Sequence, residues 1–230
     1  MKPDRIVFVH GSGRAGVDAW PNQVDWPGAV FLTRPGFGPG ERPVTTDFEA
    51  EAGLVERACG SGAAVVAASY GGIAAIRAAG LAPTVTSLVL CEPAAFSLAR
   101  GRPAVGAHIA AVEPIMRRAT QLSAGEFQNE FFGALGIVDV PPPGTPDELA
   151  AAERLRLQRP PWADLLDRSV FSRVPTLVVT GHWNKEYEEV AEELVVLGAQ
   201  HRRIEGFGHQ PQDSPAFHSV VTAFWDDVAG

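Results

Sequence analysis

The fold is decided by the stretch AAVVAASYGGIAAIRAAG, residues 63–80. Its first six residues are apolar and predict a buried strand, and Ile73–Ala79 predicts a helix that Gly80 is placed to cap. Ser69 stands between them on a sharp turn, with its hydroxyl exposed at the N-terminus of a helix, where backbone N–H groups and the helix dipole favour negative charge. This presentation is typical of a serine nucleophile in acyl transfer.

The same turn has a second interpretation, in which small residues simply let a helix pack closely on a sheet. Ala67 supports it, because strand-to-helix turns that carry a nucleophile usually have glycine at that position. The rest of the chain therefore has to decide between the two interpretations.

Short apolar runs alternate with helical patterns along the chain. They lack the period-two alternation of half-buried strands, so they predict strands buried on both faces, paired in parallel through right-handed crossovers. The runs are Ile6–Val9, Ala29–Leu32, Ala63–Ala68, Ser87–Cys91 and Thr176–Thr180, with a weaker sixth at His201–Ile204. Because ligands of such sheets bind beyond the carboxyl ends of the strands, we expect a functional site at that edge.

Length and composition narrow the class of protein. The 230 residues suit one α/β domain, or a core with a small insertion. The net charge of −8 argues against partners that are nucleic acids or anionic membrane surfaces. Cys59 and Cys91 give neither a disulfide framework nor metal-ligand spacing, and the N-terminal residues show no signal peptide. We therefore predict a cytoplasmic protein without a metal site.

Residues 94–174 interrupt the alternation, because they contain no convincing strand. Ser123-x-x-Glu126 and Thr145-Pro146-x-Glu148 have the pattern of capping boxes at helix starts. We predict a helical cap inserted over the strand ends, with residues 1–93 and 175–230 forming the core. The alternative is that these helices cover one face of the sheet.

Three motifs, taken in order, resemble those of the α/β-hydrolase fold. They are Val9-His10-Gly11-Ser12-Gly13, the turn at Ser69, and Gly206-Phe207-Gly208-His209, and the likeness covers nearly the whole chain. The resemblance implies an α/β architecture with a mainly parallel sheet of about six strands and a helical cap. The first two strands of the family, an antiparallel edge, have no counterpart here, since the sequence starts directly at the strand before His10-Gly11.

The resemblance also implies roles for individual residues. Ser69 is the expected nucleophile, and His209 is the expected base that later protonates the leaving group. The backbone N–H of Tyr70 supplies one donor of the oxyanion hole. The second donor is expected in the loop after His10-Gly11, at Ser12, with Gly13 as the alternative.

The acid of the predicted triad is less obvious. The family usually carries it in a Gly-x-x-Asp pattern, but here Asn184 occupies that place. A neutral amide can hold an imidazole, yet it cannot stabilise the imidazolium by charge. Some family members place the acid one strand earlier, where this chain has Glu92, and we predict Glu92. Asn184, Glu186 or Glu188 stays an alternative; Asn184 is also well placed to cap a helix.

Two further residues have a binding and a structural interpretation each. Arg34 follows a strand end, where it could meet a substrate carboxylate or tie its loop to a neighbouring acid. Trp162 could close the cap over an apolar substrate or anchor the return of the cap to the core. We expect His10 to shape its own loop.

The resulting hypothesis is a serine hydrolase that acts on a small, mostly apolar ester, lactone or thioester through an acyl-enzyme on Ser69. No metal or organic cofactor is implied, and the expected partner is a small-molecule substrate. Two alternatives stay open: a carbon–carbon bond hydrolase or lyase on the same scaffold, and a catalytically degenerate protein that binds a small molecule.

Overall fold

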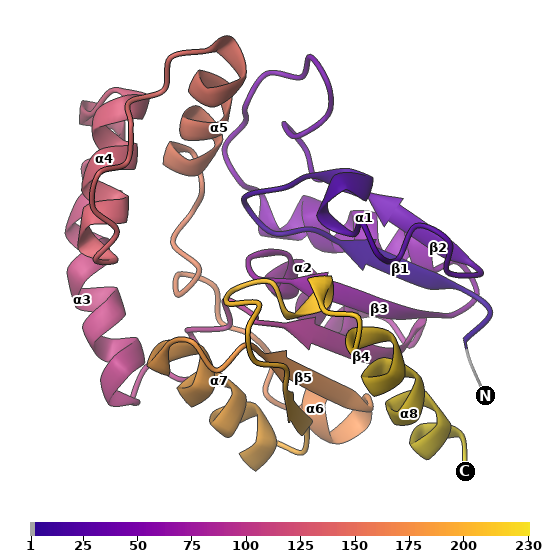
Figure 1. Cartoon of the computed structure of the whole chain (residues 1–230). Coiled ribbons are helices and arrows are strands. Elements are labelled where there is room, and N and C mark those ends of the chain that lie inside the picture. Colours follow the sequence, from indigo (N-terminus) through magenta and orange to yellow (C-terminus); the bar gives the residue numbers. More distant parts are fainter. Residues whose placement is uncertain (1–2) are drawn as a thin grey trace.

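The computed structural model describes residues 3–230, so Met1 and Lys2 of the N-terminal segment lie outside the described residues. A six-stranded parallel sheet in the order β2-β1-β3-β4-β5-β6 forms the centre of the molecule (Figure 1). The strands are β1 (Ile6–Val9), β2 (Ala29–Leu32), β3 (Ala63–Ala68), β4 (Val85–Cys91), β5 (Thr176–Thr180) and β6 (Gln200–Arg203). This confirms the predicted α/β-hydrolase fold with its parallel sheet.

Helices cover both faces of the sheet. Alternate residues of each strand point in opposite directions, so the apolar strands present side chains to both layers of helices. On β1, Val7 and Val9 join one apolar cluster, while Ile6 and Phe8 join the other. The first cluster includes residues of α1 (Phe48–Cys59), α2 (Gly71–Leu81), α6 (Val170–Arg173) and α7 (Lys185–Val196). The second includes residues of α8 (Phe217–Ala229) and of the short 3-10 helix η1 (Gly16–Ala19).

Two predictions about helix ends were wrong in detail. Gly80 lies inside α2, which continues to Leu81. It faces α6, since a Cβ at Gly80 would lie 3.5 Å from Cγ2 of Val170. The sequence around Ser214-Pro215 has the pattern of a helix start, but the last helix begins at Phe217, after the separate 3-10 turn η3 (Pro211–Asp213).

Of the four α-helices between β4 and β5 in the chain, the first three lie on the side of the sheet toward which the strands run (Figure 1). They are α3 (Pro103–Arg117), α4 (Ala124–Ala134) and α5 (Pro146–Arg156), with a 3-10 turn η2 (Ala119–Gln121) after α3. The capping boxes predicted at Ser123 and Thr145 are both formed. These helices belong to the segment 94–174 that we propose as the cap.

The sheet ends at β6, whose Arg202 and Arg203 are exposed. Charged side chains on an edge strand discourage pairing with another chain. Within residues 3–230, none of the helices is both long and apolar enough to cross a bilayer.

Candidate active site

Ser69 lies just beyond β3 in a left-handed backbone conformation, with φ +49°. Such a conformation is costly for a residue with a side chain, so the surrounding structure has to hold it. The Ser69 N–H donates to the Cys91 carbonyl at 2.8 Å, and its carbonyl accepts from Ala94 and Gly72, each at 3.0 Å. The result is a serine turned out of the sheet at the N-terminus of α2.

Glycine at position 71 is required by a close approach. A Cβ there would lie 2.4 Å from the carbonyl oxygen of His10, so a side chain would push the loop after β1 away from the turn at Ser69. The sequence feature that marks the nucleophile turn is thus also the feature that lets the His10-Gly11 loop reach it.

His209 brings its imidazole to this serine from the loop after β6. Its Nε2 lies 2.9 Å from the Ser69 Oγ. Gly206 and Gly208, which flank the turn, have φ +91° and +53°, so both adopt the left-handed region that favours glycine. Gly181, at the end of β5, leaves room for this loop, because a Cβ there would lie 1.9 Å from the Gly208 carbonyl oxygen.

Glu92 faces the other ring nitrogen of His209. Its Oε2 lies 3.3 Å from Nδ1, and the residue is 0% exposed. The Gly181 N–H donates to Oε1 at 2.6 Å, and the indole N–H of Trp183 donates to Oε2 at 2.9 Å. A buried carboxylate with two donors beside an imidazole is suited to stabilising an imidazolium.

The alternative acids are engaged elsewhere. Asn184 caps α7, where its side-chain oxygen accepts from the Tyr187 N–H at 3.2 Å. Glu186 pairs with His108 at 3.5 Å, and Glu188 accepts from Arg203 at 2.7 Å. Burial raises the pKa of Glu186, but its hydrogen bonds, with that to His108 the largest, outweigh this and leave the pKa below its usual value. Of the four candidates, Glu92 is the one beside His209.

The loop after β1 lies against the nucleophile. A Cβ on Gly11 would lie 3.0 Å from the Ser69 Cβ and 3.6 Å from its Oγ. This brings the backbone around Ser12 to the same side of the Ser69 turn as Tyr70, the residue after Ser69. The expected oxyanion donors therefore come from neighbouring segments, although their sequence positions are far apart.

Comparisons with known proteins identify the family of the chain. The model of the family described as "Alpha/beta hydrolase family" matches residues 6–222. The chain belongs to the alpha/beta hydrolase family. A hydrolase is the class of enzyme that this membership supports. No curated protein matches the chain.

Solved structures of low sequence identity share the fold. MenH from S. aureus superposes with a TM-score of 0.65 at 17% identity, over 100% of this chain and 96% of that one. NosK from Streptomyces actuosus gives 0.61 at 21% identity, over 100% of both chains. A structure described under carboxylesterases of Nitrososphaera gargenis gives 0.66 at 10% identity, over 99% of this chain and 91% of that one. At identities this low, the likeness shows only that these proteins share the fold.

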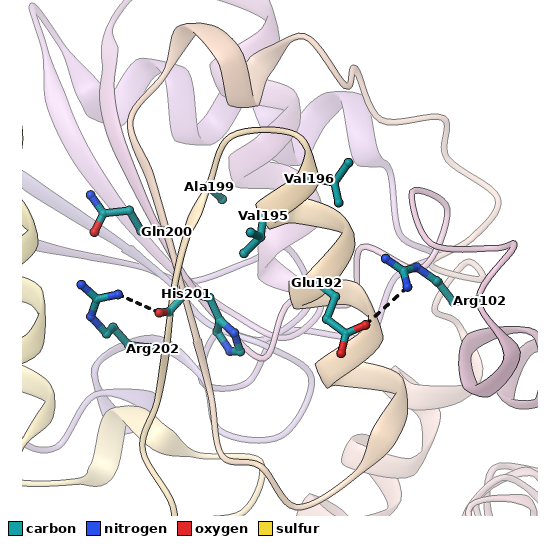
Figure 2. Close-up of a pocket in the computed structure, with 8 residues that line it drawn as sticks. All are labelled: Arg102, Glu192, Val195, Val196, Ala199, Gln200, His201 and Arg202. Carbon is teal, nitrogen blue, oxygen red and sulfur yellow. Dashed lines mark hydrogen bonds and ion pairs between the residues drawn. The ribbon is translucent and has the colours of Figure 1, made fainter.

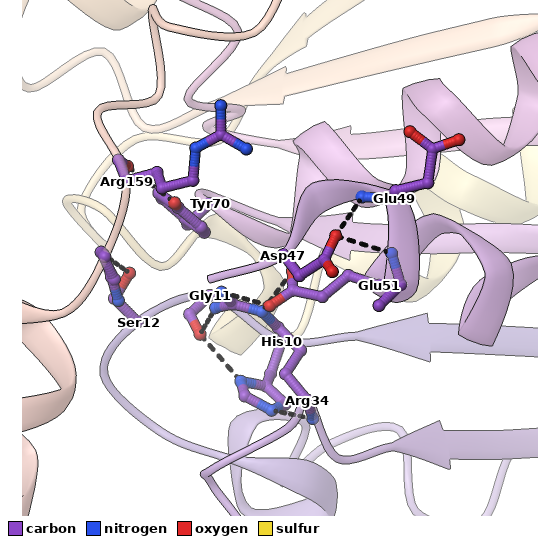
Figure 3. Close-up of polar contacts among 11 residues, drawn as sticks. His10, Gly11, Ser12, Arg34, Asp47, Glu49, Glu51, Tyr70 and Arg159 are labelled. Atoms are coloured by element: carbon purple, nitrogen blue, oxygen red, sulfur yellow. Dashed lines mark hydrogen bonds and ion pairs between the residues drawn. The ribbon is translucent and has the colours of Figure 1, made fainter. Parts of the chain in front are cut away.

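Two residues expected at the oxyanion hole also use their side chains. The Ser12 hydroxyl donates to Oε1 of Gln158 at 3.0 Å, and the Tyr70 hydroxyl donates to the Arg159 carbonyl at 2.7 Å; Ser12, Tyr70 and Arg159 appear together in Figure 3. Burial raises the pKa of Tyr70 well above its ordinary value, so the phenol stays a neutral donor. Sequence reasoning treated these positions as backbone alone and missed that both are tied to the segment returning from α5.

Arg34 is not free to meet a substrate carboxylate, which corrects the binding interpretation. It is 2% exposed, and its guanidinium donates to both carboxylate oxygens of Glu51, at 3.0 and 3.1 Å, and to the Gly11 carbonyl at 3.0 Å (Figure 3). Its backbone N–H donates to Nε2 of His10 at 3.0 Å. Arg34 thus ties its loop to α1 and to the loop after β1, as the structural interpretation expected.

His10 shapes the same loop, as predicted. Its Nδ1 lies 2.8 Å from the Gly11 carbonyl oxygen, and its Nε2 accepts from Arg34. Burial, helped by the nearby Arg34 charge, lowers the pKa of His10 from 6.5 to about 4. The imidazole is therefore neutral at pH 7 and serves as structure.

Trp162 is 2% exposed and belongs to the main apolar cluster. Its ring lies 6.1 Å from that of His108, and its carbonyl accepts from Arg100 at 3.1 Å. The structure thus gives Trp162 the anchoring interpretation: it fixes the chain as it returns from α5 to the core.

Sequence reasoning missed Tyr187. Its ring centroid lies 4.7 Å from that of His209 and 5.5 Å from that of Phe96. Burial raises its pKa well above the ordinary value, while a hydrogen bond with the Ser69 side chain acts weakly in the other direction. The one sequence signal was its place three residues after the helix-capping Asn184, which turns it toward the strand ends.

A surface hollow of about 650 Å³ lies away from these residues, between α7 and β6 (Figure 2). Its walls include the ion pair of Arg102 with Glu192 and the aliphatic side chains of Val195 and Val196. Neither Ser69 nor His209 lines this hollow, so it is not part of the candidate active site. The contacts among Ser69, His209 and Glu92 locate that site.

Proposed function

We propose that the chain is a serine hydrolase that cleaves a small, mostly apolar ester, lactone or thioester through an acyl-enzyme on Ser69. The observation that carries the proposal is the continuous line of contacts from the Ser69 Oγ to His209 Nε2 at 2.9 Å, and from His209 Nδ1 to Glu92 Oε2 at 3.3 Å. These are the contacts that a nucleophile, its base and an orienting carboxylate require.

The reaction follows from this arrangement. With a proton on Nδ1 directed at Glu92, Nε2 of His209 accepts the Ser69 proton as Oγ attacks the carbonyl carbon. The backbone N–H groups of Ser12 and Tyr70 would stabilise the tetrahedral oxyanion. His209 then gives its proton to the leaving oxygen or sulfur, and that bond breaks. Water repeats the sequence on the acyl-enzyme, which releases the acid and free Ser69.

The residues around the site support an apolar substrate. The Tyr187 ring lies beside His209, with Phe96 packed against Tyr187, at centroid distances of 4.7 and 5.5 Å. The helices of the proposed cap, residues 94–174, stand beyond the strand ends (Figure 1). The pair Arg34 and Glu51 neutralise each other, so they offer no charge to a substrate. A confined substrate with a small acyl group fits this arrangement.

The test is active-site labelling combined with burst kinetics. The purified protein is treated with a fluorophosphonate probe, and turnover of p-nitrophenyl acetate is followed in the first seconds. We expect labelling at Ser69 and a burst of p-nitrophenol of about one equivalent, both lost in Ser69→Ala and retained in Ser172→Ala, whose hydroxyl only bonds the Ser169 carbonyl. No labelling of the native protein, or turnover that survives Ser69→Ala, would overturn the proposal.

A further inference from the structure

The Glu92 carboxylate is held by three neighbours, and one of them is a tryptophan. Oε1 accepts from the Gly181 N–H at 2.6 Å, and Oε2 accepts from the Trp183 indole N–H at 2.9 Å. The same Oε2 faces His209 Nδ1 at 3.3 Å, so the indole lies closer to it than the imidazole does. The indole nitrogen is a donor only, so this hydrogen bond has a fixed direction.

Trp183 is itself held in place, although it is 49% exposed. Its ring stacks on Tyr187 with a centroid distance of 6.2 Å and an interplanar angle of 30°. Both rings also contact His209, at 5.8 and 4.7 Å. The two aromatic residues straddle the start of α7, so the position of the indole N–H follows from the same helix end that Asn184 caps.

A glutamate needs such a support more than an aspartate would. Its side chain has one more rotatable bond, and fixing it costs more conformational entropy. The Gly181 N–H restrains one oxygen, but rotation about the last bond still has to be set for Oε2 to meet His209. The indole donor sets it.

We propose that Trp183 is a positioning residue, whose indole N–H orients the Glu92 carboxylate toward His209. The inference rests on the proposed function, because it assigns Trp183 a role in the same Ser69 reaction. The indole also draws charge from Oε2, since a hydrogen bond to an ionised acceptor is a strong one. Without it, the carboxylate is less well oriented toward His209.

The test compares Trp183→Phe with Trp225→Phe. The first removes the indole N–H but keeps a ring to stack on Tyr187. The second is a matched control, because Trp225 also loses one indole hydrogen bond, to the Ser87 hydroxyl at 3.2 Å, but lies on α8 in the apolar cluster on the opposite face. Rates are measured per folded protein on a short-chain p-nitrophenyl ester across pH, and thermal unfolding is recorded for both variants.

We expect Trp183→Phe to lower kcat/KM about tenfold relative to Trp225→Phe, the size of effect that follows from losing one hydrogen bond to a charged group. The fall should lie in kcat with little change in KM. The same substitution made on Glu92→Gln should have almost no further effect, since the indole acts through that carboxylate.

Two results would overturn the inference. One is a Trp183→Phe rate within twofold of the control. The other is a loss of the same size on the Glu92→Gln background, which would show that the indole acts elsewhere. If Ser69→Ala keeps full activity, the proposed function fails; if Ser69→Ala is inactive and Trp183→Phe is not impaired, only the role of Trp183 fails.

Discussion

Ser69 and Glu92 lie in matching positions just beyond the carboxyl ends of the adjacent strands β3 and β4. Both adopt left-handed backbone conformations, with φ +49° and +46°. Ala68 pairs with Cys91 across β3 and β4, so each of the two residues is the first beyond its strand. The Glu92 N–H still donates to the Val179 carbonyl at 2.9 Å, which supports its turn. Two adjacent strands thus each turn one side chain outward, and a single imidazole can reach both.

Replacing Glu92 by Gln should cut kcat by about 10²–10⁴, because a neutral amide orients His209 poorly and does not stabilise the imidazolium. KM should change little. Asn184→Ala is the comparison, since it removes only the cap of α7 and should cost about 1 kcal/mol of stability with activity within a few-fold of wild type. Steady-state kinetics and urea unfolding of both variants check this. A nearly silent Glu92→Gln with a crippling Asn184→Ala would reverse the assignment.

Sequence patterns predicted the strands and the turn at Ser69, because each depends on residues close together in the chain. The apolar run before Ser69 and the helix after it define the turn almost alone. Glu92 was predicted from the resemblance to the hydrolase family, some of whose members carry the acid one strand earlier, and from the order of nucleophile, carboxylate and histidine. The sequence could not predict the contact of Trp183 with Glu92, because that contact depends on β5, which precedes Trp183, pairing beside β4, which precedes Glu92.

Arg34 shows the same limit from the other side. Its two interpretations differed only in what the guanidinium meets, and that partner, Glu51, lies on α1. The packing of α1 against the sheet brings the pair together, and no local pattern specifies it. Contacts between residues of separate elements, including Tyr70 with Arg159, are what the structure adds.

Replacing Tyr70 by Phe should loosen the link between the proposed oxyanion hole and the segment that returns from α5. The hydroxyl donates to the Arg159 carbonyl at 2.7 Å, and a neutral hydrogen bond of this kind contributes about 1 kcal/mol. We expect kcat/KM to fall about fivefold, and faster hydrogen exchange in the 157–162 segment. Ser12→Ala, which breaks the contact with Gln158, should add to the effect. Unchanged exchange in both variants would show that the link does not hold this segment.

Replacing Gly181 by Ala should impair activity more than stability. The added Cβ would lie 1.9 Å from the Gly208 carbonyl oxygen, so the loop that carries His209 has to move. A displacement of about 1 Å at a reacting group can cost about 10²-fold in rate. Gly133→Ala is a matched control, because a Cβ there meets nothing within 4 Å and, like Gly181, Gly133 lies outside the left-handed region. Equal activity losses in the two variants would mean that displacement of the His209 loop is not responsible.

Replacing His10 by Asn should flatten the pH dependence of stability. Burial lowers the pKa of His10 to about 4 in the folded protein, against its ordinary value of 6.5 in the unfolded chain. Between these values the unfolded chain binds more protons, so the free energy of unfolding rises with pH in this window. The neutral, buried His10 thus contributes about 3 kcal/mol above pH 6.5, which is lost as the pH falls toward 4.

The measurement is urea unfolding of the wild type and of His10→Asn at several values between pH 4 and pH 7. His10→Asn should be less stable at pH 7, since it loses the ring that accepts from Arg34 and contacts Phe37 at 4.9 Å, but its stability should fall less steeply with acidity. If the curves of His10→Asn and the wild type are parallel, the proton uptake on unfolding comes from other groups, and His10 is not the residue that limits stability in acid.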